Sequence, residues 1–219
     1  MNIQYKTRNL YPDELRILNK LKSQKEKEKM SKIKLHHFVT ATILGTVLIY
    51  ISSKIPDSFW LFLSGTTAVL LFAFVFFTPF EIYKKRKRHK SFLQQLNTII
   101  AKGTVDTYLV MAKEIAIAPE YDDESDLYII EINENEVLYL WDTEYNLNKK
   151  FPCLNFEIYD DVFFKLTNRQ IYQLSEKIQP RKIDKKAKLN FIKQNGAPKH
   201  LEIEKINLAE LFQKYNNYI

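Results

Sequence analysis

Residues 35–80 read LHHFVTATILGTVLIYISSKIPDSFWLFLSGTTAVLLFAFVFFTPF, and no other part of the chain limits its architecture as strongly. Apolar residues fill 12 of the 21 positions in 35–55 and 16 of the 22 in 59–80, and Lys54 is the single charged residue of the two segments. At about 1.5 Å per residue, a helix over either segment reaches roughly 31 to 33 Å, enough to cross a hydrocarbon core of about 30 Å. The sequence therefore predicts two membrane-spanning helices.

The link between the two segments is short, and its Pro-Asp pair favours a turn (KIPDS, residues 54–58). We therefore expect an antiparallel hairpin with both chain ends on one side of the membrane. Residues 1–34 carry ten basic and four acidic side chains (net +6), and residues 81–90 carry six and one (net +5). Because short flanks rich in Lys and Arg stay in the cytoplasm, we expect a multi-pass protein of the cell (inner) membrane with both termini cytoplasmic.

The basic flank after the second span is predicted to contact the membrane surface, with a bilayer that carries anionic headgroups as the partner. Its cations are Lys84, Lys85, Arg86, Lys87, Arg88 and Lys90. Within the hairpin, Gly45 and Gly65 lie at similar distances from the turn, and small residues let two helices approach closely. We expect the hairpin to pack at these two glycines, and self-association into a homo-oligomer is an open alternative.

The polar parts of the chain divide into three segments. Residues 1–34 are expected to be a basic, helical N-terminal segment, with a helix that begins near Pro12 and could continue into the first span. Pro79 is expected to end or kink the second span, residues 81–102 to form a basic juxtamembrane helix, and Gly103 to stop it. Residues 103–219 are expected to form a cytosolic β-rich domain.

Short apolar or alternating runs mark the expected strands of this domain. They lie at 105–111, 115–117, 127–132, 137–141, 154–158, 162–166, 171–174, 189–192 and 201–203. Asn207 is expected to cap a closing helix. The predicted fold class is a membrane α-helical hairpin plus a small β-rich soluble domain, an antiparallel barrel or a sandwich-like structure, with a C-terminal helix.

No catalytic constellation is evident. The four glycines are too scattered for a phosphate-binding loop, and Cys153 with four histidines offers no zinc-ligand spacing, so we assign no catalytic residue and no cofactor. The best metal candidates are Asp122, Glu124 and Asp126, which alternate as oxygen ligands do in calcium loops, although Leu127 stands where an EF-hand needs Gly.

Charge argues against nucleic acid as a partner. Residues 91–219 carry 16 basic and 20 acidic side chains (net −4), so the soluble region lacks the positive field of a phosphate-binding domain. Five of the eight residues in 181–188 are basic, and we interpret this run as a solvated loop.

The order of the soluble region's motifs resembles a known pattern. The acidic pair Asp123-Glu124, Tyr128, Leu140-Trp141, Phe151-Pro152 and Phe156-Glu157-Ile158 follow one another over about residues 103–200. This order is similar to a functionally uncharacterised bacterial family of two-span membrane proteins with a β-rich cytosolic C-terminal domain. The resemblance implies an architecture and no activity.

The leading hypothesis is a membrane-anchored, non-enzymatic cytosolic protein that binds an unknown protein or senses a small-molecule ligand. One alternative is a bacterial defence effector whose hairpin oligomerises when the β-rich domain senses a ligand. The other is a metal-dependent enzyme at the acidic loop of residues 122–126.

Overall fold

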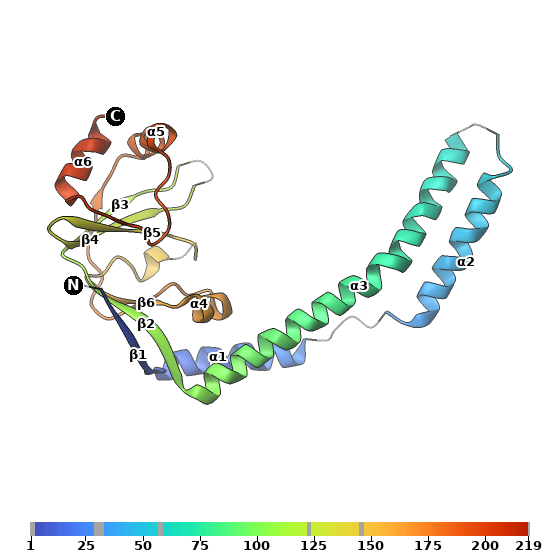
Figure 1. Ribbon diagram of the computed structural model, residues 1–219, viewed down its shortest axis with the longest axis horizontal. Coiled ribbons are helices and arrows are strands. Elements are labelled where there is room, and N and C mark those ends of the chain that lie inside the picture. The colour runs from blue at the N-terminus through green and yellow to red at the C-terminus, as the bar shows by residue number, and fades with distance from the viewer. Residues whose placement is uncertain (1–2, 29–32, 57–58, 122–123, 145–146, 219) are drawn as a thin grey trace. The chain divides into compact units, whose positions relative to one another are not determined.

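The computed structural model describes residues 3–28, 33–56, 59–121, 124–144 and 147–218 (Figure 1). The chain divides into two compact units. The β domain consists of Met1–Ile17 and Ile99–Ile219, and the helical unit consists of Leu18–Thr98. The N-terminal segment therefore belongs in part to the β domain, which the sequence had placed entirely at residues 103–219.

Two sheets form the β domain within the described residues. The first has the order β1-β2-β6-β7, and all its neighbours are antiparallel: Ile3–Asn9, Thr104–Met111, Asn155–Tyr159 and Ile171–Gln173. The second has the order β8-β3-β4-β5-β9: Arg181–Lys182, Glu114–Ala118, Leu127–Asn133, Glu136–Trp141 and Ile203–Glu204. Its one parallel pair among the described strands is β3 with β8.

The two sheets pack as a sandwich, in agreement with one of the two predicted β architectures. Tyr128 and Ile130 of β4 point into the core between the sheets, where Phe156 of β6 meets them. Ile129 of β4 points to the opposite face, where it packs with Leu211. Figure 1 shows α5 (Lys185–Asn195) and α6 (Leu208–Asn216) over this outer face. Strand β4 is thus buried on both faces, which explains its continuous apolar run.

Two of the predicted strands are helices. Residues 162–166 lie in α4 (Asp161–Thr167), where Asp160 accepts a hydrogen bond from the Phe163 N–H at 3.0 Å and caps the helix. Residues 189–192 lie in α5, which Asp184 caps in the same way. Short apolar runs do not distinguish strand from helix, and the capping aspartates are the signal that decides.

The closing helix of the domain agrees with the prediction from the sequence. Asn207 caps α6 as predicted, accepting from the Glu210 N–H at 2.7 Å. A short 3₁₀ helix, η1, covers Leu147–Lys149. The basic run of residues 181–188 is not a loop, because it forms β8 and the first turn of α5.

Strand β1 is the main departure from the prediction. It pairs with β2 along its whole length, from Ile3 opposite Val110 to Asn9 opposite Thr104. Helix α1 (Pro12–Lys27) then begins at the predicted Pro12 and ends before the first apolar helix. The Leu10 N–H donates to the Gly103 carbonyl at 2.9 Å, so the chain leaves the sheet and returns to it at one place. Everything from α1 to α3 is therefore an insertion between two neighbouring strands.

A buried ionic cluster joins three parts of the β domain: strand β1, the start of α1 and strand β6. Arg8 donates to both carboxylate oxygens of Glu14, at 2.8 and 2.7 Å, and its Nε donates to Glu157 of β6 at 2.5 Å. The guanidinium carbon lies 3.8 Å from the centroid of the Tyr11 ring. The Tyr159 hydroxyl donates to Glu14 as well. All three charged side chains are at least 90% buried.

Hydrogen bonds and opposite charges stabilise the ionised forms of Arg8 and Glu14. Burial alone would raise the pKa of Glu14, but hydrogen bonds from Arg8, Tyr159 and the Tyr11 N–H outweigh burial and hold that pKa below its ordinary value. Burial likewise opposes the charge of Arg8, yet its bonds to Glu14 and Glu157 raise its pKa. A buried ion pair becomes costly when one partner is removed, because the other charge is left without compensation.

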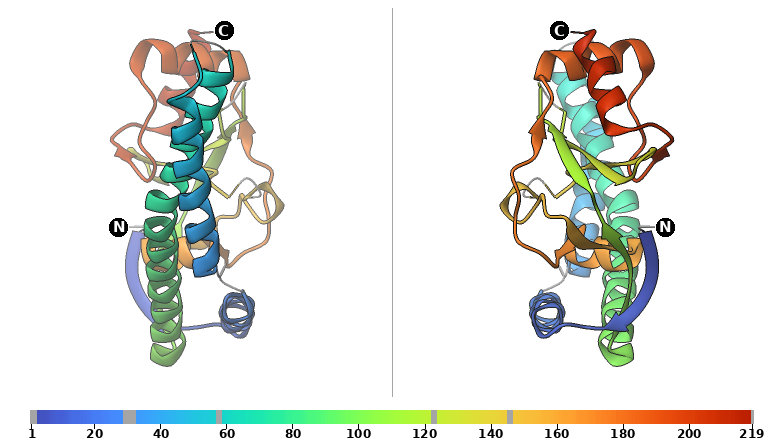
Figure 2. Two further views of the ribbon diagram at one scale, coloured as in Figure 1. Left: turned by 90° about the vertical axis from the view of Figure 1, so that its right-hand side faces the viewer. Right: turned by 90° about the vertical axis from the view of Figure 1, so that its left-hand side faces the viewer.

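The helical unit contains two long apolar helices. Helix α2 covers Leu35–Ser52, and α3 covers Phe59–Lys102 and continues unbroken through Pro79. The helix therefore does not end at Pro79, and the juxtamembrane segment expected at residues 81–102 is part of α3; the alternative expectation, a kink at Pro79, is compatible with a proline inside the helix. Figure 2 shows α2 beside the first part of α3 and α1 beside its later part. Leu18 of α1 and Leu96 of α3 are both fully buried.

We predict that Arg8→Met lowers the free energy of unfolding by about 3 to 5 kcal/mol, because two buried carboxylates lose their cation. The measurement is urea unfolding of the full chain in detergent, followed by Trp141 fluorescence in a Trp60→Phe background. Lys6→Met is the matched control, since it removes one positive charge from an exposed position of the same strand. Equal effects of the two substitutions would contradict the importance of the cluster.

The same cluster predicts a dependence on pH. Because the pKa of Glu14 is lower in the folded chain, its stabilising contribution is complete above the ordinary value of 4.5 and declines as the pH falls below it. Glu14→Gln should be less stable than the wild type at pH 7, and the difference should shrink as the pH is lowered toward 3. Urea titrations at a series of pH values measure this difference, and a gap that stays constant would refute it.

Candidate functional site

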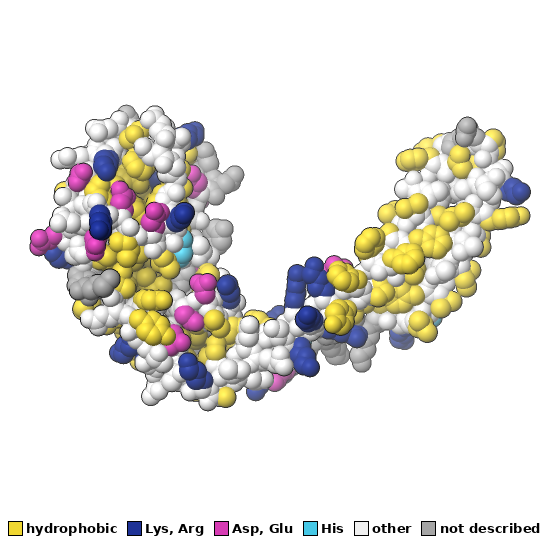
Figure 3. Space-filling view, viewed as in Figure 1, with side chains coloured by type: hydrophobic (Ala, Val, Ile, Leu, Met, Phe, Trp, Pro, Cys, Tyr) yellow, Lys and Arg dark blue, Asp and Glu magenta, His cyan; other side chains and the backbone are white. Residues whose placement is uncertain are grey.

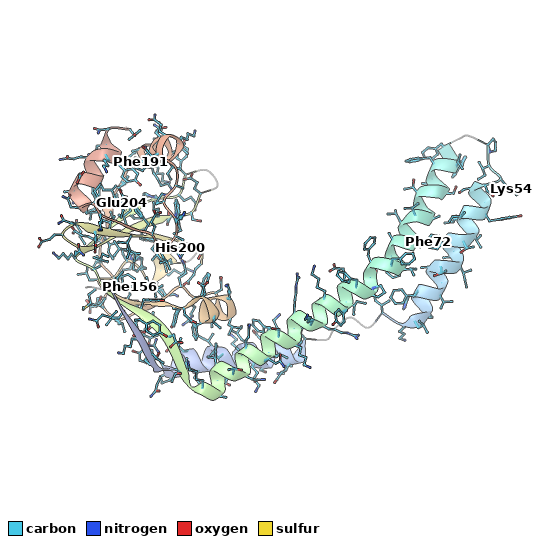
Figure 4. The ribbon with its side chains drawn as sticks, viewed as in Figure 1. Lys54, Phe72, Phe156, Phe191, His200 and Glu204 are labelled. Atoms are coloured by element: carbon cyan, nitrogen blue, oxygen red, sulfur yellow. The ribbon has the colours of Figure 1, made fainter. Side chains whose placement is uncertain are left out.

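The two apolar helices pack closely at Gly45. A Cβ atom at this position would lie 3.0 Å from Cε2 of Phe72, so the absent side chain is what lets the ring approach. Figure 4 labels Phe72 on the side of α3 that faces α2. Phe38 and Phe74 stack with their ring centroids 5.5 Å apart, and the Ser52 and Ser64 hydroxyl oxygens are 2.6 Å apart near the turn. Gly45 is thus a packing position of the hairpin.

Gly65 has a different environment. A Cβ atom there would meet nothing within 4 Å, so this glycine does not take part in the contact between α2 and α3. Most of the apolar surface of the two helices is exposed in the same way. In the most apolar 18-residue stretch of each helix, only 11% is buried in α2 and 6% in α3. Figure 3 shows the exposed apolar side chains in yellow. Both helices are long and apolar enough to cross a membrane, and little of either helix is buried within the described residues.

The six cations predicted to contact the membrane surface follow the apolar part of α3 on the same helix, and all six are exposed. Dark blue side chains gather on this part of the helix in Figure 3. Their helical spacing distributes them around the axis, so they do not form one flat face.

The predicted metal ligands are held by other partners. Asp122 lies outside the described residues. Asp126 accepts a hydrogen bond from the Glu120 N–H at 2.7 Å, and Glu124 lies 3.4 Å from the ammonium nitrogen of Lys188. Among the described residues, no three His, Cys, Asp or Glu side chains converge as a metal site would require.

Lys188 of α5 contacts both the backbone and an acidic side chain of this loop. It is fully buried on α5, donates to the Ser125 carbonyl at 3.2 Å, and lies 5.7 Å from the centroid of the Trp141 ring. Burial lowers its pKa, and the nearby charge of Glu124 opposes that effect in part. A buried lysine paired with a carboxylate is a structural tie between α5 and the acidic loop.

Cys153 is fully buried in the core between the sheets. Its thiol lies 3.5 Å from the Asn155 carbonyl, and burial raises its pKa. Because the thiolate is the reactive form, both burial and the raised pKa disfavour reaction at this cysteine, which packs as a core residue.

A cavity of about 990 Å³ opens in the β domain between α5, the segment of residues 196–204, and α6. Its charged and aromatic lining consists of Glu202, Glu204, Lys205, Lys214, Tyr139, Phe191 and Tyr218. Figure 4 labels Phe191 of α5 and Glu204 of β9, which both line this cavity. The Tyr139 hydroxyl donates to Glu204, and burial followed by this bond raises its pKa. Opposite charges beside aromatic rings suit a small ligand that carries both charges.

Sequence reasoning missed both the Arg8 cluster and this cavity. The cluster joins residues 8, 14 and 157, which no local pattern connects. The cavity depends on α5 being a helix, and Asp184 as its N-cap was the signal that could have revealed it.

No protein-family model, no curated protein and no solved structure matches this chain. The resemblance to bacterial two-span membrane proteins therefore stays a prediction.

We predict that Gly45→Ile destabilises the hairpin by about 1 to 3 kcal/mol, because the added side chain must displace Phe72. Gly65→Ile is the matched control, as it adds the same atoms where the chain leaves open space. Unfolding of the full chain in mixed micelles, followed by Trp60 fluorescence in a Trp141→Phe background, measures both. A larger loss at Gly65 than at Gly45 would show that the contact is placed wrongly.

Proposed function

We propose that this chain is a membrane-anchored cytosolic protein whose β domain binds a protein or a small ligand and does not catalyse a reaction. The observation that carries the proposal is the insertion of the two apolar helices between the paired strands β1 and β2. Because these strands form one sheet, the chain must leave the domain and return to the same side. An even number of membrane crossings meets this requirement.

The charges flanking the hairpin support the orientation. The segment before α2 and the segment of α3 after Phe80 are both rich in Lys and Arg, and such flanks stay in the cytoplasm. The turn at residues 54–58 would then face the opposite side of the cell membrane. Topology and charge are independent arguments, and they favour the same placement of both termini.

A binding role is supported by how the candidate catalytic groups are used. Glu124 is paired with Lys188, Asp126 is bonded to the loop backbone, and Cys153 is buried with a raised pKa. The cavity beside α5 and α6 offers both charges and aromatic rings to a ligand. We therefore favour binding there over chemistry at the acidic loop.

Cysteine labelling in intact cells tests the anchor. In a Cys153→Ser background, Ser53→Cys in the turn should react with an impermeant maleimide added outside, whereas Lys165→Cys should react only after permeabilisation. The Lys165 side chain is 74% exposed in the β domain, so lack of reaction reports the membrane and not burial. Labelling of Lys165→Cys in intact cells, or recovery of the chain without membranes, would overturn the proposal.

The cavity is tested by thermal melting of the full chain in detergent with a panel of free amino acids and nucleotides. A ligand bound there should raise the melting temperature, and Lys214→Gln should reduce that rise. Lys165→Gln is the control, because this lysine lies outside the cavity. A panel that shifts nothing would remove the cavity as a site for these ligands and leave a protein partner.

A further inference from the structure

One face of the basic part of α3 is turned toward α1. Lys85, Arg88, His89 and Phe92 recur at intervals of three and four residues, which places them on one side of a helix. Together with Lys25 of α1 and Glu28 just beyond it, they line an open cavity of about 290 Å³. Lys84 and Lys87 do not line this cavity. The six cations of α3 are therefore not equivalent.

The cavity has an excess of positive charge. Three cations, Lys25, Lys85 and Arg88, surround one carboxylate, Glu28. Lys25 donates to Glu28 at 2.8 Å, and this bond, followed by the charges of His89 and Lys85, lowers the pKa of Glu28. The Lys25 ammonium also lies 5.9 Å from the centroid of the Phe92 ring, which forms an apolar wall. One acid cannot neutralise three bases, so the cavity favours a further anion.

The position along α3 indicates which anion is available. Lys85 follows Phe80 by five residues, or about 7.5 Å along the helix axis. The headgroup layer of a bilayer extends about 5 to 8 Å beyond each side of the hydrocarbon core. Long cationic side chains also reach toward this layer. Lys85 thus lies at the level of lipid phosphates if the preceding apolar segment spans the membrane.

We propose that this cavity is a discrete binding site for the headgroup phosphate of one anionic phospholipid. The inference rests on the proposed membrane anchoring and makes it specific. Lys25, Lys85 and Arg88 contact the phosphate, and Lys84 and Lys87, which do not line the cavity, contribute only to the diffuse surface field.

Native mass spectrometry of the full chain, released from micelles with equal amounts of phosphatidylglycerol and phosphatidylcholine, tests the site. The wild type should retain one phosphatidylglycerol in preference. Lys85→Gln with Arg88→Gln should lower that preference about thirtyfold, because each direct hydrogen bond to the phosphate that is lost costs about fivefold. Lys84→Gln with Lys87→Gln is the matched control, which removes the same charge from the same helix turn and should retain the preference.

A second pair of variants tests the contribution of α1. Lys25→Gln should weaken retention about fivefold, whereas Lys22→Gln, on the same helix but outside the cavity, should not. Equal losses in both double variants would mean a diffuse field and would overturn the proposal. Displacement of the lipid by millimolar inorganic phosphate would also overturn it, because the site would then recognise the free anion.

Failure of the anchor can be told apart from failure of the site. Carbonate extraction of cell membranes should leave the wild type and all variants in the pellet. A chain that is released in every form contradicts membrane anchoring itself. A chain that stays in the pellet but shows no preference for phosphatidylglycerol contradicts the site alone.

Discussion

The bond between Arg8 and two buried carboxylates is the constraint on which the rest of the β domain depends. Glu14 belongs to the first turn of α1 and Glu157 to the middle of β6, so the guanidinium group joins the start of the chain to a strand that follows nearly 150 residues later. Both carboxylate oxygens of Glu14 accept hydrogen bonds, and Oε2 of Glu157 accepts one from Arg8. Without this cation, Glu14 and Glu157 would be two buried carboxylates with no opposite charge beside them.

The same junction explains why the helices can be inserted into the domain. Strands β1 and β2 behave as a β-hairpin whose connection has been replaced by α1, α2 and α3. The Leu10 to Gly103 bond closes the base of this connection, and Gly103 has a positive φ of 66°, which a residue with a side chain rarely adopts. The pairing of β1 with β2 is therefore complete at the point where the inserted helices begin and end.

Much of this architecture could be predicted from the sequence, for identifiable reasons. The apolar segments that became α2 and α3, the alternation in β2 and β6, and the Asn207 cap each depend on nearby residues. Strand β1 could not be predicted, because its exposed face is polar and its stability comes from pairing with distant β2. Lys188 was missed for a related reason, since its burial depends on Glu124 and Trp141 from other parts of the chain. Local patterns identify elements, and long-range pairs decide which residues are buried.

The separation of β1 from β2 also has a consequence for biosynthesis. Ile3 emerges from the ribosome about 100 residues before Val110, its partner in the sheet. At about 5 to 20 residues per second, the first strand waits for roughly 5 to 20 seconds. In the proposed arrangement both apolar helices enter the translocon during that interval. A chain that fails to return its second helix cannot deliver β2 to β1, so completion of the cytosolic fold reports that both crossings have been made.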